Sequence, residues 1–181
     1  MTTQRQLLTA LIAVLAAALI SFVLTPVVKA LAPKFGFVDV PKDERRMHNH
    51  PIPTIGGLAI FVSFVLVSLF VCHLNRQFIG MLLGALVIVV LGVVDDKYDL
   101  SAKLKLAVQI LAAAIPVSQG VVIRYISHPF GFLGVPYLSL GVLAVPVTIC
   151  WIVAITNAVN FIDGLSYNYD ILVSNKDALE S

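Results

Sequence analysis

Three aspartates at the end of an apolar run are the residues whose types and spacing could do chemistry. Asp95, Asp96 and Asp99 follow an apolar stretch that begins near Phe78, so the carboxylates come where a membrane helix would meet water. Acidic side chains oppose the dipole at the C-terminal end of a helix, and adjacent carboxylates repel each other. Mg²⁺ would remove both penalties, because it binds one or two carboxylates together with substrate phosphates. We therefore predict that these three aspartates hold Mg²⁺, with Mn²⁺ as an alternative ion.

This prediction depends on the local backbone. If the helix continues one turn past the membrane, Asp95 and Asp99 share a face and all three carboxylates can address one cation. An ordinary solvated helix end, at which charged residues are common, is the competing interpretation.

A second polar cluster lies in another apolar run. Asn157, Asn160 and Asp163 recur every three residues, so on a helix they form a slanted polar stripe along one face. Polar side chains inside a membrane helix either serve a ligand or bond to a neighbouring helix. The spacing leaves both interpretations open, and the Asp-Gly pair at the end of the stripe favours a ligand.

Basic residues form the third cluster. Arg45, Arg46 and His48 follow the first apolar run, and arginine pairs with phosphate oxygens through two parallel hydrogen bonds. Lys103 and Lys105 come just after the aspartates and would neutralise a diphosphate held there. The competing interpretation is a set of ordinary basic loops on the inner side of a membrane.

The composition indicates an all-α integral membrane protein. Of the 181 residues, 59% are hydrophobic and 12% are charged, whereas soluble domains are about 45–50% apolar and about 25% charged. The net charge of +2 is too small to argue for nucleic acid, and Cys72 and Cys150 are interpreted as small apolar residues. About five transmembrane helices are predicted from the apolar runs Leu7–Val28, Gly57–Leu74, Phe78–Val94, Leu104–Ser118 and Gly141–Ile162.

The basic residues also predict the orientation of these spans. They concentrate after the first span and between the third and fourth, which places those loops inside and the N-terminus outside. The ends of the third and fifth spans then meet the basic loop on the cytoplasmic face, so the three polar clusters converge there. Residues 120–140 contain alternating apolar residues followed by Pro and Gly, which predicts a short outer hairpin at the membrane interface.

Taken together, the three clusters resemble the polyprenyl-phosphate N-acetylhexosamine-1-phosphate transferase family. The resemblance runs from about residue 7 to 165, and its motifs are Arg45-Arg46-Met47-His48 with Pro53-Thr54-Ile55-Gly56-Gly57, then Asp95-Asp96-Lys97-Tyr98-Asp99 with Lys105 and Gln109, then Asn157 to Gly164. The DDxxD form is similar to the branch that acts on N-acetylglucosamine. The resemblance implies that N-acetylglucosamine 1-phosphate passes from UDP-N-acetylglucosamine to undecaprenyl phosphate at the plasma (inner) membrane, with UMP released, to start a surface glycan such as teichoic acid or lipopolysaccharide.

The resemblance also implies roles for the residues. Asp95 and Asp96 are expected to be catalytic, by placing the metal or orienting the acceptor. The expected substrate-binding residues are Asn157, Asn160, Asp163, Lys103, Lys105, Arg45, Arg46, His48 and Thr54. The expected partners are the two substrates, the lipid bilayer and a second copy in a homodimer.

The chain departs from the family pattern at its end. Ser166 stands where the family usually has a second aspartate after Asp-Gly-Leu, and the family's length implies further spans. We therefore expect residues 1–165 to form a membrane domain, the N-terminal half of such a transferase, and residues 166–181 to form an atypical polar tail. A truncated non-catalytic fragment is the alternative. A transporter would need polar residues at mid-span, and the five apolar runs argue against a soluble prenyl synthase.

Overall fold

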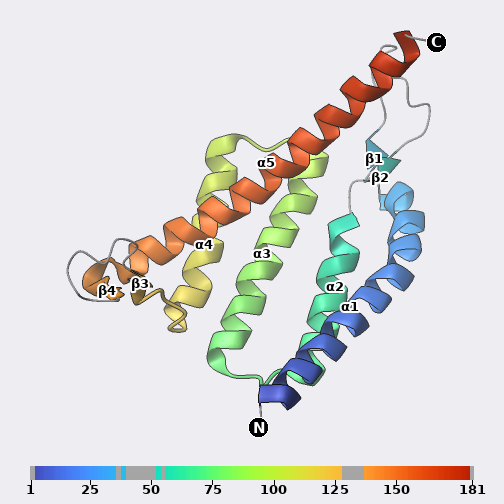
Figure 1. The fold of residues 1–181 in the computed structure, drawn as a ribbon. Helices are drawn as coiled ribbons and strands as arrows, with labels where there is room; N and C mark the ends of the chain where they lie inside the picture. The colour runs from blue at the N-terminus through green and yellow to red at the C-terminus, as the bar shows by residue number, and fades with distance from the viewer. Residues whose placement is uncertain (1–2, 36–37, 40–51, 54–55, 128–136, 180–181) are drawn as a thin grey trace.

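The computed structural model describes residues 3–35, 38–39, 52–53, 56–127 and 137–179 as an assembly of long helices (Figure 1). The α-helices are α1 Thr3–Leu31, α2 Gly56–Val71, α3 Arg76–Tyr98, α4 Ala102–Ser118 and α5 Ala144–Leu179. Short 3₁₀ helices, η1 Ala32–Phe35 and η2 Gly141–Leu143, adjoin α1 and α5. Strands β1 Val38–Asp39 and β2 Ile52–Pro53 pair antiparallel, as do β3 Tyr125–Ser127 and β4 Tyr137–Ser139.

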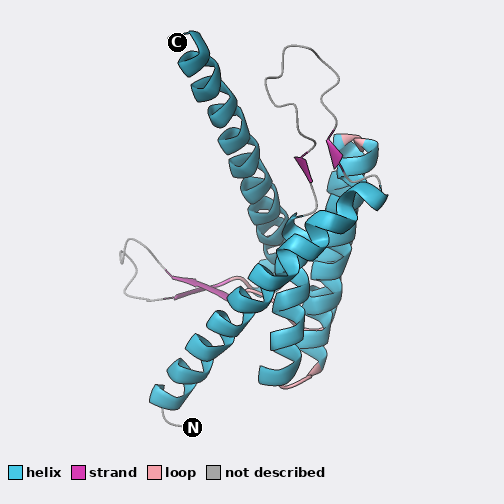
Figure 2. Cartoon of the chain, turned by 90° about the vertical axis from the view of Figure 1, so that its right-hand side faces the viewer, coloured by secondary structure: helices cyan, strands magenta, loops and turns pink. Residues whose placement is uncertain are grey.

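The helices alternate in direction. In Figure 1, α1, α3 and α5 run towards the upper end of the molecule, and α2 and α4 run away from it. The C-terminal ends of α1, α3 and α5 therefore share one end with the N-terminal ends of α2 and α4, and the view turned by 90° agrees (Figure 2). The β1–β2 pair lies at this end too. The predicted convergence is confirmed for the ends of α3 and α5. For the segment that carries Arg45, Arg46 and His48 it stays a prediction, because those residues lie outside the described ones.

Helices α3 and α4 pack closely because α3 presents glycines to α4. A Cβ atom on Gly84 would lie 2.8 Å from the carbonyl oxygen of Ala112 and 3.0 Å from Cδ of Pro116, and one on Gly80 would lie 2.7 Å from Cγ of Gln119. Gly80 and Gly84 are four residues apart, so they lie on one face of α3. Small residues at this spacing let helix backbones approach closely in a membrane, where packing replaces the hydrophobic effect as the main attraction.

Helices α1 and α2 form a second antiparallel pair. The small residues Ala59 and Ser63 of α2 are 0% and 1% exposed, and the Ser63 hydroxyl donates to the carbonyl oxygen of Ala59 at 2.6 Å. This intrahelical bond satisfies the hydroxyl group within the packed interface. Helix α5 crosses α4 and α3 obliquely, as Figure 1 shows.

The membrane class predicted from composition is confirmed. Among the described residues, three helical stretches are long and apolar enough to cross a bilayer, namely Thr3–Lys34, Arg76–Tyr98 and Gly141–Ile162, and Gly57–Val71 is a shorter apolar helix. Helix α4 has 17 residues with two lysines in its first turn. Helices lie at all five predicted positions, whereas the count of five full spans stays a prediction.

The structure also describes the predicted hairpin before α5 and the C-terminal part of α5 itself. The predicted hairpin is confirmed by the β3–β4 pair, in which Ile126 lies opposite Leu138, and its position on the outer side of the membrane stays a prediction. Its base is fixed to α5 because the amide of Ile123 donates to the hydroxyl of Thr148 at 2.8 Å, and Thr148 is only 3% exposed. At the other end of α5, the helix is continuous to Leu179, so it extends through the predicted boundary at residue 165.

Candidate functional site

The turn between α3 and α4 is built around the carboxylate of Asp95. Its Oδ1 lies 2.7 Å from Nζ of Lys105 and also accepts a hydrogen bond of 3.0 Å from the amide of Leu100. The Asp95 and Lys105 side chains are 28% and 33% exposed, respectively. The last turn of α3 is thereby fixed to the first turn of α4 by a charge-assisted contact, and part of each charged group remains accessible to a ligand.

Helix α3 ends before the third aspartate. Asp99 has φ 48° and ψ 68°, the left-handed conformation of a C-terminal cap, and its amide donates to the carbonyl oxygen of Asp95 at 2.8 Å. The expectation that the helix carries Asp95, Asp96 and Asp99 on one continuous surface is therefore wrong for Asp99. The chain can turn here because aspartate tolerates the left-handed region, and because the Asp95 carboxylate takes up the amide of Leu100 just beyond it.

The three aspartates consequently do not form a compact ligand set. Asp95 is half-buried, whereas Asp96 and Asp99 are exposed. Within the part of the chain that the structure describes, no group of three or more His, Cys, Asp and Glu side chains could hold a metal ion. The metal-binding role of these aspartates stays a prediction, and any ion held here would take its remaining ligands from substrate and water.

Helix α4 begins immediately after this turn. The hydroxyl of Ser101 caps the helix by accepting from the amide of Leu104 at 3.4 Å. Lys103 is exposed in the first helical turn, two residues before Lys105. The N-terminal end of a helix carries partial positive charge, and the two lysines add to it. The predicted phosphate-binding lysines therefore lie beside the predicted carboxylates.

One turn further along α4, a pair of amides joins α4 to α5. Nε2 of Gln109 donates to Oδ1 of Asn157 at 3.3 Å, and Nδ2 of Asn157 donates to Oε1 of Gln109 at 2.7 Å. The same Nδ2 donates to the carbonyl oxygen of Val153 at 2.8 Å. Gln109 is 3% exposed, so this reciprocal pair satisfies a buried amide between apolar helices. Of the two interpretations left open by the spacing, the structure shows helix–helix bonding for Asn157.

The rest of the asparagine stripe lies further along α5. Asn160 is exposed, and Asp163 belongs to the same continuous helix. Because α5 and α4 run in broadly opposite directions, residues that follow Asn157 lie towards the end of α4 at which Lys103 and Lys105 are found. The part of α5 that carries Asn160 and Asp163 therefore extends towards the α3–α4 turn with Asp95 and Lys105, which we call the charged turn. The substrate-binding role of Asn160 and Asp163 stays a prediction.

The basic segment cannot be placed in the same way. Arg45, Arg46, His48 and Thr54 lie outside the described residues. The flanking strands β1 and β2 pair with each other, with Val38 opposite Pro53. This strand pair lies at the end of the molecule to which α3 and α5 also run (Figure 1).

Sequence reasoning missed several residues that build this site. Gln109 was recognised only as part of a family motif, although a polar residue within the apolar α4 was itself a signal of a buried partner. The glycines of α3 were not singled out, although their four-residue spacing in an apolar run is typical of close helix packing. The structure shows that both features set the positions of α3, α4 and α5.

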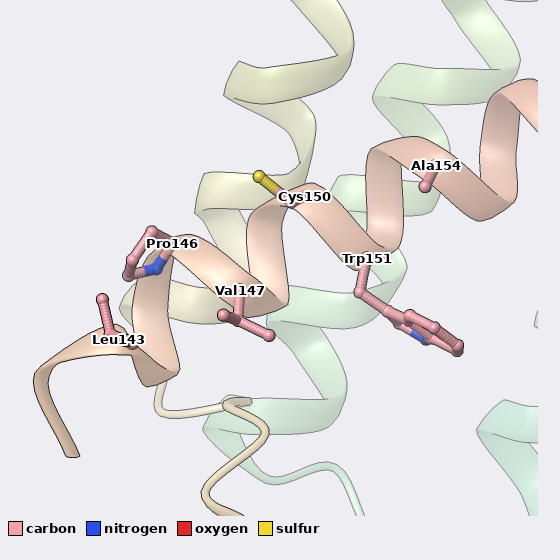
Figure 3. A pocket seen from close by; sticks show the side chains of 6 residues that line it. All are labelled: Leu143, Pro146, Val147, Cys150, Trp151 and Ala154. Carbon is pink, nitrogen blue, oxygen red and sulfur yellow. The ribbon is translucent and has the colours of Figure 1, made fainter. Parts of the chain in front are cut away.

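Two pockets lie away from the charged turn. A pocket of about 390 Å³ on α5 is lined by Leu143, Pro146, Val147, Cys150, Trp151 and Ala154 (Figure 3). It offers no charged side chain to a phosphate. A second pocket, of about 250 Å³, lies between the N-terminal end of α3 and the C-terminal end of α4. Neither pocket is part of the Asp95–Lys105 site.

The fold and this turn define an α-helical membrane protein that gathers carboxylate, amide and lysine groups at one end of its helices. Comparison with known proteins shows what this region is similar to. Residues 78–166, which include the charged turn and the asparagine stripe, match the model of glycosyl transferase family 4. Over these residues, just under half of its length, the chain is similar to that family.

The relatives are all longer than this chain. It is 42% identical over 144 residues to a probable undecaprenyl-phosphate N-acetylglucosaminyl 1-phosphate transferase of Bacillus subtilis, covering 79% of this chain and 39% of the relative. It is 36% identical over 160 residues to a decaprenyl-phosphate N-acetylglucosaminephosphotransferase of Mycolicibacterium smegmatis, covering 83% of this chain and 39% of the relative. An undecaprenyl-phosphate alpha-N-acetylglucosaminyl 1-phosphate transferase of Thermotoga maritima is 32% identical over 153 residues, covering 82% of this chain and 44% of the relative.

The matched part of the chain thus spans about two fifths of the length of these relatives. This partial coverage fits the predicted N-terminal half. No solved structure matches the chain significantly.

Proposed function

We propose that this chain provides the charged, membrane-embedded part of an enzyme that transfers N-acetylglucosamine 1-phosphate from UDP-N-acetylglucosamine to undecaprenyl phosphate. The observation that carries the proposal is the Asp95–Lys105 pair, 2.7 Å apart at the α3–α4 turn, within the region that matches glycosyl transferase family 4. The names of the relatives supply the donor sugar and the lipid acceptor. The site lies at a helix end, where a lipid phosphate in the bilayer and a soluble nucleotide sugar can meet.

The donor groups at this turn suit Mg²⁺. Oδ1 of Asp95 is taken by Lys105 and the amide of Leu100, and among the described residues Oδ2 has no protein partner. Oδ2 of Asp95 and the exposed carboxylate of Asp96 are hard oxygen donors, and Mg²⁺ needs only one or two of these when phosphates complete its shell. We propose that Asp95 and Asp96 hold the ion. When bound there, the ion would supply positive charge to the reacting phosphates.

The chain's own residues would then orient and neutralise the reactants. A phosphate monoester has a second pKa of about 6, so undecaprenyl phosphate is mostly a dianion at pH 7 and gains little from a general base. One of its oxygens would attack the β-phosphorus of the nucleotide sugar, and the bond from that phosphorus to the bridging oxygen would break, so UMP leaves with both electrons. Lys105, held by Asp95, and the exposed Lys103 would stabilise the growing negative charge.

The remaining groups would bind the nucleotide sugar. We propose this role for Asn160 and Asp163, because the part of α5 that carries them follows the Gln109–Asn157 pair and is directed towards the charged turn. Arg45, Arg46 and His48, from the segment between β1 and β2, and Thr54, which follows β2, would contact phosphate. In the orientation that we propose, this end faces the cytoplasm at the plasma (inner) membrane, and the product begins a surface glycan such as teichoic acid or lipopolysaccharide.

A chimeric enzyme tests the proposal. Residues 7–165 of this chain would replace the matching segment of the Bacillus subtilis relative, and transfer of radiolabelled N-acetylglucosamine phosphate to undecaprenyl phosphate would be measured in washed membranes. We expect Mg²⁺-dependent transfer, which Asp95→Asn and Asp96→Asn each abolish. Arg124→Gln, an exposed change near the hairpin, is the control and should retain full activity.

Two results would contradict the proposal. A chimera that inserts in membranes at the level of the parent relative but transfers no sugar phosphate would show that this segment is a non-catalytic fragment. Substantial activity in Asp95→Asn or Asp96→Asn would remove the metal-binding or catalytic role from that residue.

A further inference from the structure

A second polar feature of the helices lies far from the charged turn. Arg76 begins α3 and Asp95 lies in its last turn, 19 residues later. At a rise of about 1.5 Å per residue these positions are about 28 Å apart along the helix. The hydrocarbon core of a bilayer is about 30 Å thick. When the Asp95–Lys105 turn lies at one membrane surface, Arg76 therefore lies at the opposite one.

A pocket of about 250 Å³ opens at this opposite end, between α3 and α4. Its lining combines one cation, one amide and an apolar wall, contributed by Arg76, Ile79, Gly80, Leu83, Ile115 and Gln119. Gly80 leaves room in the pocket, because a Cβ there would lie 2.7 Å from Cγ of Gln119. The pocket thus combines a guanidinium group and an amide with apolar side chains.

The charge of Arg76 is uncompensated in the part of the chain that the structure describes. The ion pair of Asp95 with Lys105 lies at the other end of α3. Gln119, whose Nε2 donates to the hydroxyl of Ser118 at 3.2 Å, also lines the pocket. A ligand that complements the pocket therefore brings negative charge to Arg76 and apolar surface to Leu83 and Ile115.

We propose that this pocket binds the phosphate of an anionic phospholipid, with the start of an acyl chain against Ile79, Leu83 and Ile115. Arginine at a membrane surface keeps its apolar stem in the hydrocarbon and its guanidinium group at the level of the lipid phosphates. A free phosphate ion would gain a single cation and lose water to an apolar wall, which is costly. The lipid pays no such penalty, because its own apolar chains already lie beside α3 and α4. The site is separate from the proposed transferase site.

Binding by the purified 181-residue chain tests this site. The chain would be stripped of lipid in detergent, and bound lipids would be counted by native mass spectrometry during titration with dioleoyl-phosphatidylglycerol or dioleoyl-phosphatidylcholine. We expect one phosphatidylglycerol to bind more tightly than phosphatidylcholine. Arg76→Gln should weaken this first phosphatidylglycerol about fivefold, the effect of one basic residue at an anionic surface, and Ile79→Trp should fill the pocket and weaken it too.

Arg124→Gln is the matched control, since Arg124 is an exposed arginine near the same end of α4 but does not line the pocket. It should bind phosphatidylglycerol like the unaltered chain, and circular dichroism should show the same helix content in all variants. If Arg76→Gln and Arg124→Gln lose the same amount of affinity for phosphatidylglycerol, the binding reflects a general attraction of the chain for anionic lipid. That result would overturn the proposal. Displacement of the lipid by millimolar inorganic phosphate would show a free-anion site and overturn it as well.

Discussion

The amide pair between α4 and α5 gives the sharpest test of how the site is assembled. Replacing Gln109 by Leu removes two interhelical hydrogen bonds, of 2.7 Å and 3.3 Å, and leaves the Oδ1 atom of Asn157 without its partner. Hydrogen bonds between membrane helices contribute about 0.6 kcal/mol each on average. Asn157 itself is exposed, so no penalty for an unsatisfied buried group is added to the loss of the two bonds. We therefore expect Gln109→Leu to lower the free energy of unfolding by about 1 kcal/mol.

The double variant separates pairing from packing. Asn157→Leu alone should cost more, about 2 kcal/mol, because it also leaves the buried Gln109 amide unsatisfied. Gln109→Leu combined with Asn157→Leu removes both polar groups, and such paired apolar replacements are nearly neutral. The sum of the two single losses in unfolding free energy should therefore exceed the loss in the double variant. The difference, which is the coupling energy of the pair, should be at least about 1 kcal/mol.

Unfolding of the full chain in mixed micelles, followed by circular dichroism as the denaturing detergent is increased, measures these energies. Thr156→Val is the control on α5, because its hydroxyl donates only to the carbonyl oxygen of Ile152 in the same helix, at 2.9 Å. It should change stability by less than about 0.5 kcal/mol. If the losses of the two single variants add up to the loss of the double variant within about 0.5 kcal/mol, Gln109 and Asn157 do not interact and the proposed pairing is refuted.

Three further predictions follow from other contacts. In the chimeric enzyme, Lys105→Met should lower the rate of transfer at least about 100-fold, as expected for loss of a positioned charge that stabilises a transition state. Gly84→Ala should destabilise the purified chain by about 1–3 kcal/mol, because its Cβ would overlap α4, whereas Gly92→Ala, in open space on the same helix, should stabilise it by up to about 1 kcal/mol. Thr148→Val should release the base of the hairpin and speed tryptic cleavage after Arg124 about fivefold, on the order of one hydrogen bond.

Each of these has a result that counts against it. Unchanged transfer in Lys105→Met would mean that the ion pair only fixes the turn. Equal stabilities of the Gly84→Ala and Gly92→Ala variants would show that α3 and α4 do not pack as closely as the structure has them. For the hairpin, Thr25→Val is the control, because that hydroxyl bonds within α1 to the carbonyl oxygen of Ser21. Equal cleavage of the Thr148→Val and Thr25→Val variants would exclude the anchor.

The helices were predictable because their signal is local. Long apolar runs bounded by polar residues predicted helices at the positions of all five α-helices, and alternating residues followed by Pro and Gly predicted the β3–β4 hairpin. The convergence of the ends of α3 and α5 also followed from the sequence, since the distribution of basic residues predicted that successive spans alternate in direction. The extension of α5 to Leu179 was not predicted, because polarity marks the edge of a membrane and not the end of a helix.

Details of the site depended on backbone geometry and on the register between helices. The spacing of Asp95 and Asp99 suggested a shared helical face, but a left-handed cap at Asp99 removed it from the helix. The spacing of the asparagine stripe could not distinguish a ligand from a neighbouring helix. The answer for Asn157 came from the position of Gln109, 48 residues away in the sequence.

The sequence alone thus determined that this is a helical membrane protein with carboxylates, amides and cations at one end of its helices, because apolar length and charge are properties of each segment by itself. The tertiary structure decided which of these groups touch. Lys105 meets Asp95 where the glycines of α3 pack against α4, and Gln109 meets Asn157 where α5 crosses α4. Such registers depend on the fit of two surfaces at once, and no single segment encodes them.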